Sequence, residues 1–554
     1  MAYDHRKYAA FKPVHMPNRQ WPDRVITKAP DWCSVDLRDG NQALVKPMNI
    51  EQKTRMFRLL VDMGYKEIEV GFPSASQPDF DFVRKIITEG LVPDDVTIQV
   101  LTQAREDLIT RSFESLKGAR QANVHVYNST STVQRERVFG LGRDAIRNIA
   151  VQGAKWVKEG AAKAPETDWE FQYSPESFTG TELEYAAEVV NAVIAVWQPE
   201  KGQKVVINLP ATVEMSTPNV YADMIEWMCA HIDQREHVRV SLHTHNDRGC
   251  GVAAAELGVL AGADRIEGTL LGNGERTGNM CLVTMGMNLY SQGIDPGIDF
   301  SDMRRVIDTV EYCTEISTHP RHAWAGELVY TAFSGSHQDA IRKSLSRQRA
   351  DEPWQVAYLP IDPGDLGRRY EEVVRINSQS GKGGVLYVLE RDFGITLPRW
   401  LQIEFSKVVQ RHAEKTGDEV GGAAIRQLFD AAYVTLGDAW TMGNYEVSRE
   451  ADRVRVQARV GNGTLAGEGN GAVEALMDAL NRTHGVRGRI EGFDEFALGS
   501  GTEAKAMACI RLRIGDDYTA GVALADDTTT ATLQAVLSAV SRQPFAQEAT
   551  RRAG

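Results

Sequence analysis

The sequence predicts an α/β protein: a (β/α)8 TIM barrel, then a partly helical linker region, then a C-terminal α+β domain. Two observations predict the barrel. Short β-branched runs alternate with amphipathic segments between residues 31 and 292, and eight such units follow one another. A third observation, the apolar–polar alternation that begins near Tyr445, predicts a separate domain. A doubly wound open sheet is the alternative for the first half.

The barrel strands are expected where short apolar, β-branched runs recur, and the barrel helices where apolar residues repeat with helical spacing. Strands are predicted at residues 32–36, 66–71, 96–101, 122–127, 169–173, 204–209, 238–242 and 265–269. Helices are predicted at residues 50–63, 143–158, 182–197, 218–232 and 249–261.

The second half changes character twice. Residues 301–343 are predicted to be mostly helical, with further helices at 398–416 and 421–436 and loops at 346–353, 359–370 and 380–384. After residue 445, strand patterns and a helix (473–481) precede two more strands (490–498, 506–514) and a helix (532–541). Ala466-Gly467 before the first of these helices is echoed by Ala520-Gly521 before the second, which indicates a domain of two similar halves.

Composition narrows the class of protein. The net charge of −13, from 62 Lys and Arg against 75 Asp and Glu, argues against nucleic acid as the main partner. No apolar run is long enough to span a bilayer, so we expect no membrane association, and residues 1–22 lack the apolar core of a signal peptide. Six scattered cysteines without a Cys-x-x-Cys pair fit a reducing compartment. A cytoplasmic protein is therefore expected.

The first motif, Asp-Leu-Arg-Asp-Gly-Asn-Gln at residues 36–42, directly follows the first strand. In a barrel this is the carboxyl-terminal rim, where active sites lie. Asp39 offers a hard oxygen ligand for a divalent cation, and Arg38 offers a fork of donors for a carboxylate or a developing enolate oxygen. A loop salt bridge is the alternative explanation of this segment.

The second motif, His243-Thr244-His245, ends the seventh strand. Residues two apart on a strand point to the same face, so both imidazoles are expected to converge on one metal ion. Asp39 supplies a third ligand, because the first and seventh strands are next but one in a closed barrel. Such a set suits Mg²⁺, Mn²⁺, Fe²⁺ or Zn²⁺. Histidines with a purely structural role are the alternative.

The third motif is the glycine-rich segment 272–279 after the eighth strand, whose last residue, Asn279, is expected to add an amide oxygen to the metal. A phosphate-binding loop is the alternative, although the spacing matches neither of the common nucleotide-binding patterns.

Other rim positions carry residues suited to acid–base chemistry or binding. Glu69 lies on the second strand, facing either inward or outward, Glu176 lies in a predicted loop after the fifth, and Thr212 follows the sixth. His337 lies in a predicted glycine–serine turn and Tyr358 in a loop, and both are candidate proton donors or acceptors.

Taken together, these segments resemble the 2-isopropylmalate synthase family, acyltransferase-type synthases of the metallolyase barrel superfamily. The resemblance rests on the three motifs at 37–42, 243–247 and 272–279 and on the segments 173–178, 208–213, 333–340 and 377–384, and it covers residues 32 to about 541.

The resemblance implies a reaction and a set of roles. Members of the family condense acetyl-CoA with 2-oxoisovalerate and hydrolyse the thioester, which gives 2-isopropylmalate and CoA in the first committed step of leucine biosynthesis. A divalent metal, Mg²⁺ first and Mn²⁺ or Zn²⁺ next, would be held by Asp39, His243, His245 and Asn279. Arg38 and Thr212 would contact the oxo acid, and Glu176, His337 and Tyr358 would surround the acetyl-CoA chemistry, with Glu176 and His337 as candidates for the base.

The resemblance also implies an assembly and a regulator. We expect a homodimer in which the linker region covers the barrel mouth of the partner, and feedback inhibition by L-leucine bound to the C-terminal domain. Gly461, Gly463, Gly467 and Gly469 are predicted to offer exposed backbone groups to the amino acid, or else only to form hairpin turns. Where the family often carries Trp-Gly-Val-Gly, this chain has Thr519-Ala-Gly-Val-Ala.

The expected domains are an N-terminal extension (1–30), a catalytic barrel (31–325), linker subdomains (326–437) and a leucine-binding regulatory domain (438–554). Homocitrate and citramalate synthases, which would share the metal site, are alternatives, as is a lyase running in the cleavage direction. A leucine-sensing protein with an inactive barrel is the alternative from a different class.

Overall fold

The computed structural model describes residues 13–202, 204–368, 382–416, 419–498 and 504–543. Residues 377–381 of the segment 377–384 lie outside the described residues. The expectation of a loop at 380–384 was wrong for residues 382–384, which begin a helix, α12 (Lys382–Phe393). The chain divides into two compact units. The first comprises Met1–Val329 and Pro363–Arg368, and the second comprises Tyr330–Asp362 and Arg369–Gly554. None of the described helices is both long and apolar enough to cross a membrane.

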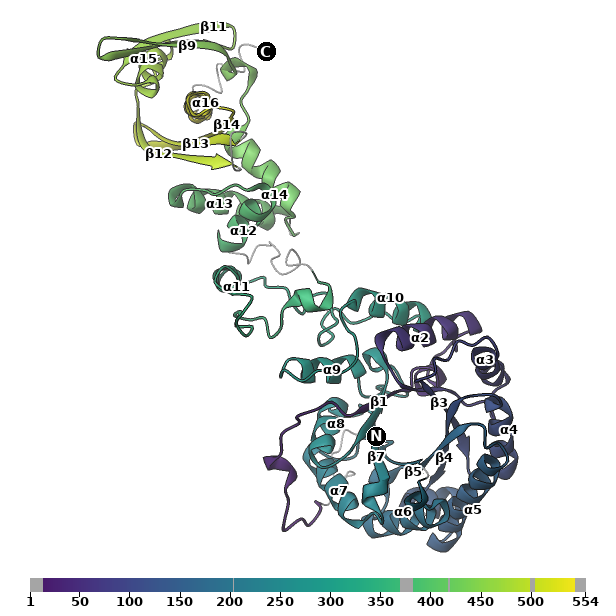
Figure 1. Cartoon of the computed structure of the whole chain (residues 1–554). Coiled ribbons are helices and arrows are strands. Elements are labelled where there is room, and N and C mark those ends of the chain that lie inside the picture. The colour runs from purple at the N-terminus through teal and green to yellow at the C-terminus, as the bar shows by residue number, and fades with distance from the viewer. Residues whose placement is uncertain (1–12, 203, 369–381, 417–418, 499–503, 544–554) are drawn as a thin grey trace, which may run out of the picture. The chain divides into compact units, whose positions relative to one another are not determined.

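The first unit is a closed barrel of eight parallel strands (Figure 1). The strands follow chain order, and β1 pairs with both β2 and β8, so the ring closes. The predicted barrel is confirmed and the open sheet is excluded. The strands are β1 (Asp31–Ser34), β2 (Glu67–Gly71), β3 (Thr97–Gln103), β4 (Gln121–Ser129), β5 (Asp168–Glu176), β6 (Lys204–Ala211), β7 (Val238–Thr244) and β8 (Arg265–Gly268).

Helices α2 to α8 follow strands β1 to β7 around the outside of the barrel (Figure 1). Helix α2 illustrates how local sequence sets their ends: Asn49 and Gln52 form a reciprocal capping box at its start, and Gly64 ends it with φ 102°. The helices of this unit are α1 (Asp39–Gln42), α2 (Ile50–Met63), α3 (Gln77–Thr88), α4 (Glu106–Leu116), α5 (Arg143–Ala162), α6 (Leu183–Trp197), α7 (Pro218–His231), α8 (Gly251–Leu260), α9 (Leu282–Tyr290) and α10 (Met303–Thr314).

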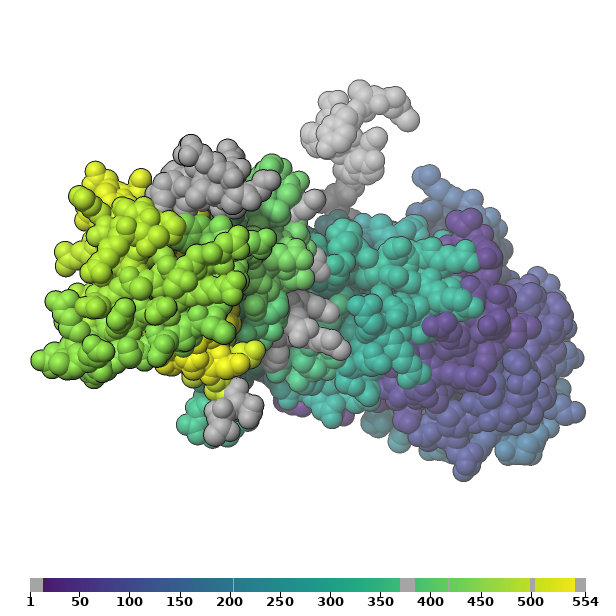
Figure 2. All heavy atoms as spheres, turned by 90° about the horizontal axis from the view of Figure 1, so that it is seen from above, coloured from purple at the N-terminus to yellow at the C-terminus, as the bar shows by residue number. Residues whose placement is uncertain are grey.

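The last helix of the barrel unit lies against the first long one. Gln52 Nε2 donates to Tyr312 O at 3.1 Å, and Cys313 Sγ donates to Gln52 O at 3.3 Å. In Figure 2 the purple atoms of α2 lie beside teal atoms of the segment that contains α10. Contacts between α2 and α10, which are far apart in the sequence, therefore hold these two helices together on the outside of the barrel.

The expectation that residues 301–343 are mostly helical was only partly right. Helix α10 ends at Thr314 and is capped by Glu315, which adopts φ 58°, and the next helix, α11 (Gly335–Leu345), begins only at Gly335. Between them, a Cβ on Gly326 would approach Pro320 O to 2.4 Å, so the chain makes a tight turn that only glycine permits.

The described part of the N-terminal extension lies along α7. Arg19 donates to both oxygens of Asp223 at 2.5 Å, and Trp21 Nε1 donates to Asp223 Oδ1 at 2.8 Å. Because Asp223 is buried, its charge needs these partners, and they fasten the extension to the barrel.

The second unit holds α11, the helices α12–α14 and two three-stranded antiparallel sheets, ordered β11-β10-β9 and β12-β13-β14 (Figure 1). Each sheet is followed by one helix, as the internal repeat predicted. The elements are α12 (Lys382–Phe393), α13 (Arg399–Thr416), α14 (Gly422–Phe429), β9 (Met442–Glu450), β10 (Arg453–Val460), β11 (Gly463–Gly469), α15 (Ala472–His484), β12 (Gly488–Leu498), β13 (Lys505–Ile514), β14 (Asp517–Ala525) and α16 (Thr528–Ser541).

Strands β11 and β14 were not predicted, because glycine and alanine have low strand propensity. The structure shows why those small residues are there. A Cβ on Gly467 would lie 2.2 Å from Ala475 O of α15, and one on Gly521 would lie 2.2 Å from Ala535 O of α16. The two halves thus repeat one packing device, a helix seated directly on a glycine of the neighbouring strand.

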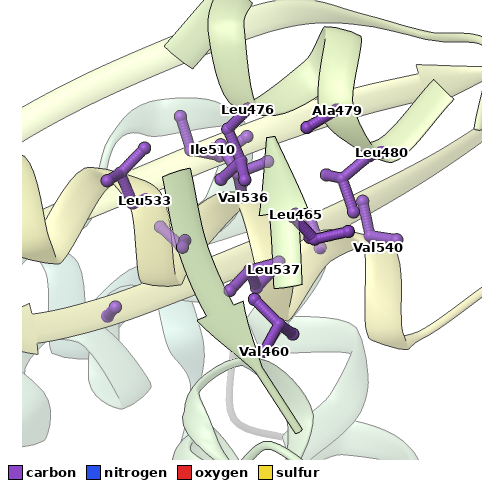
Figure 3. Close-up of a cluster of buried hydrophobic side chains, with 14 of the residues drawn as sticks. Val460, Leu465, Leu476, Ala479, Leu480, Ile510, Leu533, Val536, Leu537 and Val540 are labelled. Carbon is purple, nitrogen blue, oxygen red and sulfur yellow. The ribbon is translucent and has the colours of Figure 1, made fainter. Parts of the chain in front are cut away.

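The core of these two halves is continuous. Leu476 and Leu480 of α15 meet Val536 and Val540 of α16 in one cluster of buried side chains (Figure 3). Both helices therefore turn their apolar sides to a shared interior, which makes the repeat a single domain rather than two.

Candidate active site

Asp39, His243 and His245 lie together at the carboxyl-terminal end of the barrel strands. Strand β8 pairs with both β1 and β7, so Asp39, in the short helix α1 just past β1, faces the end of β7 across one strand. One ligand atom from each residue lies within 4.8 Å of the other two, and all three side chains are buried. This convergence is what the strand-end motifs predicted, and a buried cluster of this composition indicates a divalent metal site.

Electrostatics keeps the Asp39 carboxylate charged. Burial opposes its ionisation, but the Arg38 guanidinium, 2.6 Å away, and the two imidazoles outweigh burial and lower the pKa of Asp39 to about 2. A carboxylate that is ionised at neutral pH is the form that binds a cation.

The surroundings shift the pKa values of the two imidazoles in opposite directions. Burial and the neighbouring His243 lower the pKa of His245 to about 4. Burial also favours neutral His243, but the hydrogen bond to Glu267 and the charge of Asp39 outweigh it and raise its pKa. His245 is therefore neutral at physiological pH, as a metal ligand must be.

Asn279 lies next to the cluster, because its backbone pairs with that of His245 in an isolated antiparallel β-bridge. Its Nδ2 donates to Asp39 Oδ2 at 2.6 Å and to Asn273 O at 3.0 Å. Its Oδ1 is buried and has no hydrogen-bond partner among the described residues. The sequence led us to expect the amide oxygen on the metal, whereas here the amide nitrogen faces Asp39. Asn279, the residue next to the cluster, thus has a buried oxygen without a partner among the described residues, and a carboxylate, two imidazoles and an amide oxygen are donors that fit a divalent cation.

A pocket of about 310 Å³ opens above the cluster and contains Arg38, Thr212 and Glu176. Thr212 Oγ1 accepts a hydrogen bond from Ser177 N at 2.9 Å, which orients its hydroxyl group. The lining consists of Arg38, Asp39, Gln42, Phe72, Leu101, His125, Tyr127, Ser174, Glu176, Asn208, Pro210, Thr212, His243, His245, Glu275 and Arg276.

Glu69, whose orientation the sequence left open, points into the barrel and is fully buried. Its carboxylate pairs with Arg38 Nε on one side and with His125 Nδ1, at 2.7 Å, on the other. It therefore holds the guanidinium of Arg38 at the rim, so it has more than a space-filling role.

Glu176 is not in a loop, as the sequence suggested, but is the last residue of β5. Pairing of β5 with β6 stops at Tyr173, whereas pairing with β4 continues to Ser129 opposite Glu176. Pro175 is tolerated because its side facing β6 is unpaired. The Ser129 hydroxyl donates to Glu176 Oε2.

His337 and Tyr358 belong to the second unit. His337 was predicted in a turn but lies in the first turn of α11, with its side chain exposed. Tyr358 adopts φ 65°, unusual for a residue with a side chain, and is 61% exposed. The two rings stack on each other.

The expectation of exposed backbone at the four regulatory glycines was wrong for two of them. Gly467 and Gly469 are buried beneath α15, where a Cβ would meet that helix at 2.2 and 2.6 Å. Gly461 forms the hairpin turn between β10 and β11 with φ 54°, and Gly463 is exposed. Their part in regulation stays a prediction.

Several polar residues of the barrel interior escaped the sequence analysis. They share one signal, which is a polar side chain inside an otherwise apolar strand. They are Gln99, His125, Gln172, Ser174, Asn208 and Glu267. Alternation alone does not tell which of them reach the rim and which lie deeper in the barrel.

Comparison with known proteins places the chain in a family. Residues 29–310 match the HMGL-like family, residues 327–390 match the alpha-isopropylmalate synthase post-catalytic domain-like family, and residues 419–543 match the LeuA allosteric (dimerisation) domain. The 2-isopropylmalate synthase of Alcanivorax borkumensis is 59% identical, with 99% of each chain covered. The chain belongs to the 2-isopropylmalate synthase family.

Other 2-isopropylmalate synthases give the same picture. That of Parafrankia sp. is 56% identical, with 97% of each chain covered, and that of Pseudomonas putida strain W619 is 53% identical, with 98% of each covered. The family expected from the sequence is thereby confirmed, and homocitrate and citramalate synthases are not favoured. The dimerisation domain that this family carries indicates a homodimer and regulation by an allosteric ligand.

Proposed function

We propose that the chain condenses acetyl-CoA with 2-oxoisovalerate and hydrolyses the thioester, forming 2-isopropylmalate and CoA on the route to L-leucine. One observation carries the proposal. The buried cluster of Asp39, His243 and His245 opens into a small pocket beside Arg38, in a chain 59% identical along 99% of its length to a 2-isopropylmalate synthase.

Mg²⁺ is the proposed metal, with Mn²⁺ and Zn²⁺ as alternatives. Asp39, His243 and His245 would bind it, and the unpartnered Oδ1 of Asn279 would add a fourth donor. When bound, such a cation acts as a Lewis acid on the ketone of the oxo acid.

The other roles fall to side chains at the rim. Arg38 and Thr212 hold the carboxylate of the oxo acid, and the guanidinium also stabilises the negative charge that develops on the enolate oxygen. Glu176 or His337 takes the methyl proton of acetyl-CoA, and Tyr358 donates a proton in the same steps. Hydrolysis of the thioester then drives the condensation to completion.

The pocket supports the choice of oxo acid. Phe72, Leu101 and Pro210 are apolar residues of its lining, and its volume of about 310 Å³ is at the low end for small-molecule sites. An isopropyl group can pack against these side chains, whereas the second carboxylate of 2-oxoglutarate would lose solvation beside them.

Assembly and regulation complete the proposal. The chain forms a homodimer in the cytoplasm, with an extension (1–30), a catalytic barrel (31–325), linker subdomains (326–437) and a regulatory domain (438–554) that binds L-leucine. The match of residues 419–543 to the LeuA allosteric (dimerisation) domain supports the last of these.

A thiol-release assay with acetyl-CoA and a panel of 2-oxo acids tests the function. We expect the highest kcat/KM for 2-oxoisovalerate, ahead of pyruvate and 2-oxoglutarate. A preference for 2-oxoglutarate would move the chain to homocitrate synthesis, and a preference for pyruvate to citramalate synthesis. Absence of thiol release with every oxo acid in the presence of Mg²⁺ or Mn²⁺ would favour a sensing protein.

A further inference from the structure

The two histidines of the metal cluster differ in what lies behind them. His243 Nδ1 lies 2.9 Å from Glu267 Oε2, whereas His245 Nδ1 is buried and has no hydrogen-bond partner among the described residues. Both rings direct Nε2 towards Asp39 Oδ2, at 3.8 Å from His243 and 3.9 Å from His245. Of these two histidines, only His243 has its Nδ1, the ring nitrogen away from Asp39, hydrogen-bonded to a carboxylate within the described residues.

Glu267 is itself held firmly. It lies on β8, fully buried, and its Oε1 accepts from Gln172 Nε2 at 2.6 Å and from Arg265 Nη1 at 2.8 Å. Asn208 Nδ2 approaches Oε2 at 3.4 Å. Side chains from β5, β6 and β8 itself thus supply donors to the two oxygens, and the carboxylate has one fixed place in the barrel.

Arg265 continues the network beneath Glu267. Its guanidinium is fully buried, its Nε donates to Glu67 Oε2 at 2.6 Å, and its Nη1 also donates to Ser241 Oγ at 2.9 Å. A buried carboxylate is stable only with such a partner, so Arg265 allows Glu267 to remain a charged acceptor.

The geometry fixes which nitrogen of His243 carries the hydrogen. Carboxylate oxygens accept hydrogen bonds and do not donate them when ionised, so Nδ1 must be the donor to Glu267. The lone pair of the neutral ring is then on Nε2, the nitrogen that faces Asp39. The same hydrogen bond also fixes the plane of the ring.

We propose that Glu267 is a positioning residue of the metal centre, which sets the tautomer and ring orientation of His243 and is itself held by Arg265 and Gln172. This inference rests on the metal site of the proposed function and adds the group that prepares it. Hydrogen-bond partners of this kind typically change metal affinity by about 10- to 100-fold.

Binding of Mn²⁺ to the metal-free, full-length protein tests the proposal, with free Mn²⁺ measured by electron paramagnetic resonance. Glu267→Gln keeps the shape but loses the charge, and Glu267→Asp keeps the charge but withdraws the carboxylate by one methylene. Both are expected to weaken Mn²⁺ binding by about 10- to 100-fold. Wild-type affinity in both variants would overturn the proposal, and if Glu267→Gln does not fold, Glu267→Asp decides alone.

Glu170→Gln is the matched control. It removes a charge from another buried carboxylate of the barrel, whose partners are Asn123 and Arg239 rather than residues of the metal cluster. It should bind Mn²⁺ like the wild type. A loss as large as that of Glu267→Gln would show that any lost barrel charge suffices, which contradicts a positioning role.

A double-mutant cycle separates positioning from general damage. In a His243→Ala background, Glu267→Gln should cause no further loss of Mn²⁺ affinity, because the effect passes through His243. An equal loss with and without His243 would overturn the inference. If the wild-type protein itself does not bind Mn²⁺, the metal site of the proposed function fails, and this inference with it.

Discussion

His337 and Tyr358 stack ring on ring, with centroids 4.0 Å apart and planes inclined by 24°. Residues 21 positions apart in the chain thus form one exposed aromatic pair, and Tyr358 holds a left-handed backbone conformation to do so. The stacking brings the two residues proposed for proton transfer next to each other.

Exchange of subunits tests whether this pair serves a partner's barrel. His337→Ala should lower kcat by about 10²- to 10⁴-fold, the usual contribution of an acid–base group, with a smaller change in the KM for the oxo acid. Mixing it with inactive His245→Ala should partly restore activity, because a hybrid dimer contains one intact combination. Inactive mixtures in which native mass spectrometry detects heterodimers would contradict the trans arrangement.

Removal of metal should abolish turnover. Asp39, His243 and His245 converge on one place, and a divalent cation bound there would polarise the ketone, so its removal by chelation should stop the condensation. Added Mg²⁺ or Mn²⁺ should restore thiol release, and His245→Ala should stay inactive with an unchanged circular dichroism spectrum. Full activity in exhaustively chelated protein would contradict the metal site.

The free energy of unfolding should depend on pH through the ionisation of Asp36. This buried carboxyl accepts hydrogen bonds from Leu270 N at 3.0 Å and Ser34 Oγ at 2.8 Å, but burial dominates and raises its pKa from 3.8 to about 7. The folded state therefore keeps a proton that the unfolded state has lost. The stability that this proton provides is present below pH 4 and is lost as the pH rises through 7.

The substitution Asp36→Asn should remove the loss of stability that the wild-type protein suffers as the pH rises. The interval from 3.8 to about 7 corresponds to roughly 4 kcal/mol as an upper bound, so the variant should gain stability relative to wild type as the pH rises. Thermal unfolding of the metal-free proteins at pH 5.5 and pH 8 measures this. The difference in midpoint, variant minus wild type, should be larger at pH 8. An equal difference at both pH values would show that Asp36 does not titrate between them.

Gly467→Ala should destabilise the C-terminal domain. The added methyl group would lie 2.2 Å from Ala475 O and 2.5 Å from Ala479 N, so α15 must move, at a cost of about 1–3 kcal/mol. Gly463→Ala is the matched control on the same strand, because the nearest atom to its Cβ would be Val460 O at 3.8 Å. Hydrogen exchange in α15 should accelerate in the first variant only; equal protection in both would contradict the packing argument.

L-Leucine should bind the regulatory domain independently of the metal centre. Calorimetric titration of the intact protein should show saturable binding that persists in His245→Ala, because the metal ligands lie in the other unit. Leucine should inhibit thiol release by the wild type. Binding that disappears with the metal ligand would place leucine in the barrel and contradict a separate regulatory site.

The sequence by itself determined the barrel, the place of Asp39, His243 and His245 at its rim, and the family. These features are local: a strand ends where its apolar run ends, and residues two apart on it share a face. The repeat in the C-terminal domain was visible for the same reason, through two Ala-Gly pairs and two helices of similar pattern.

Only the tertiary structure decided the partners of those residues. In the folded chain Glu69 points inward and pairs with Arg38, and β5 continues to Glu176. The amide nitrogen of Asn279 donates to Asp39, and Glu267 lies within hydrogen-bonding distance of His243 Nδ1. Gly467 is buried beneath α15. Each of these depends on strand register and on closure of packed elements far apart in the chain, which local periodicity does not specify, because one apolar–polar pattern is compatible with several registers and partners.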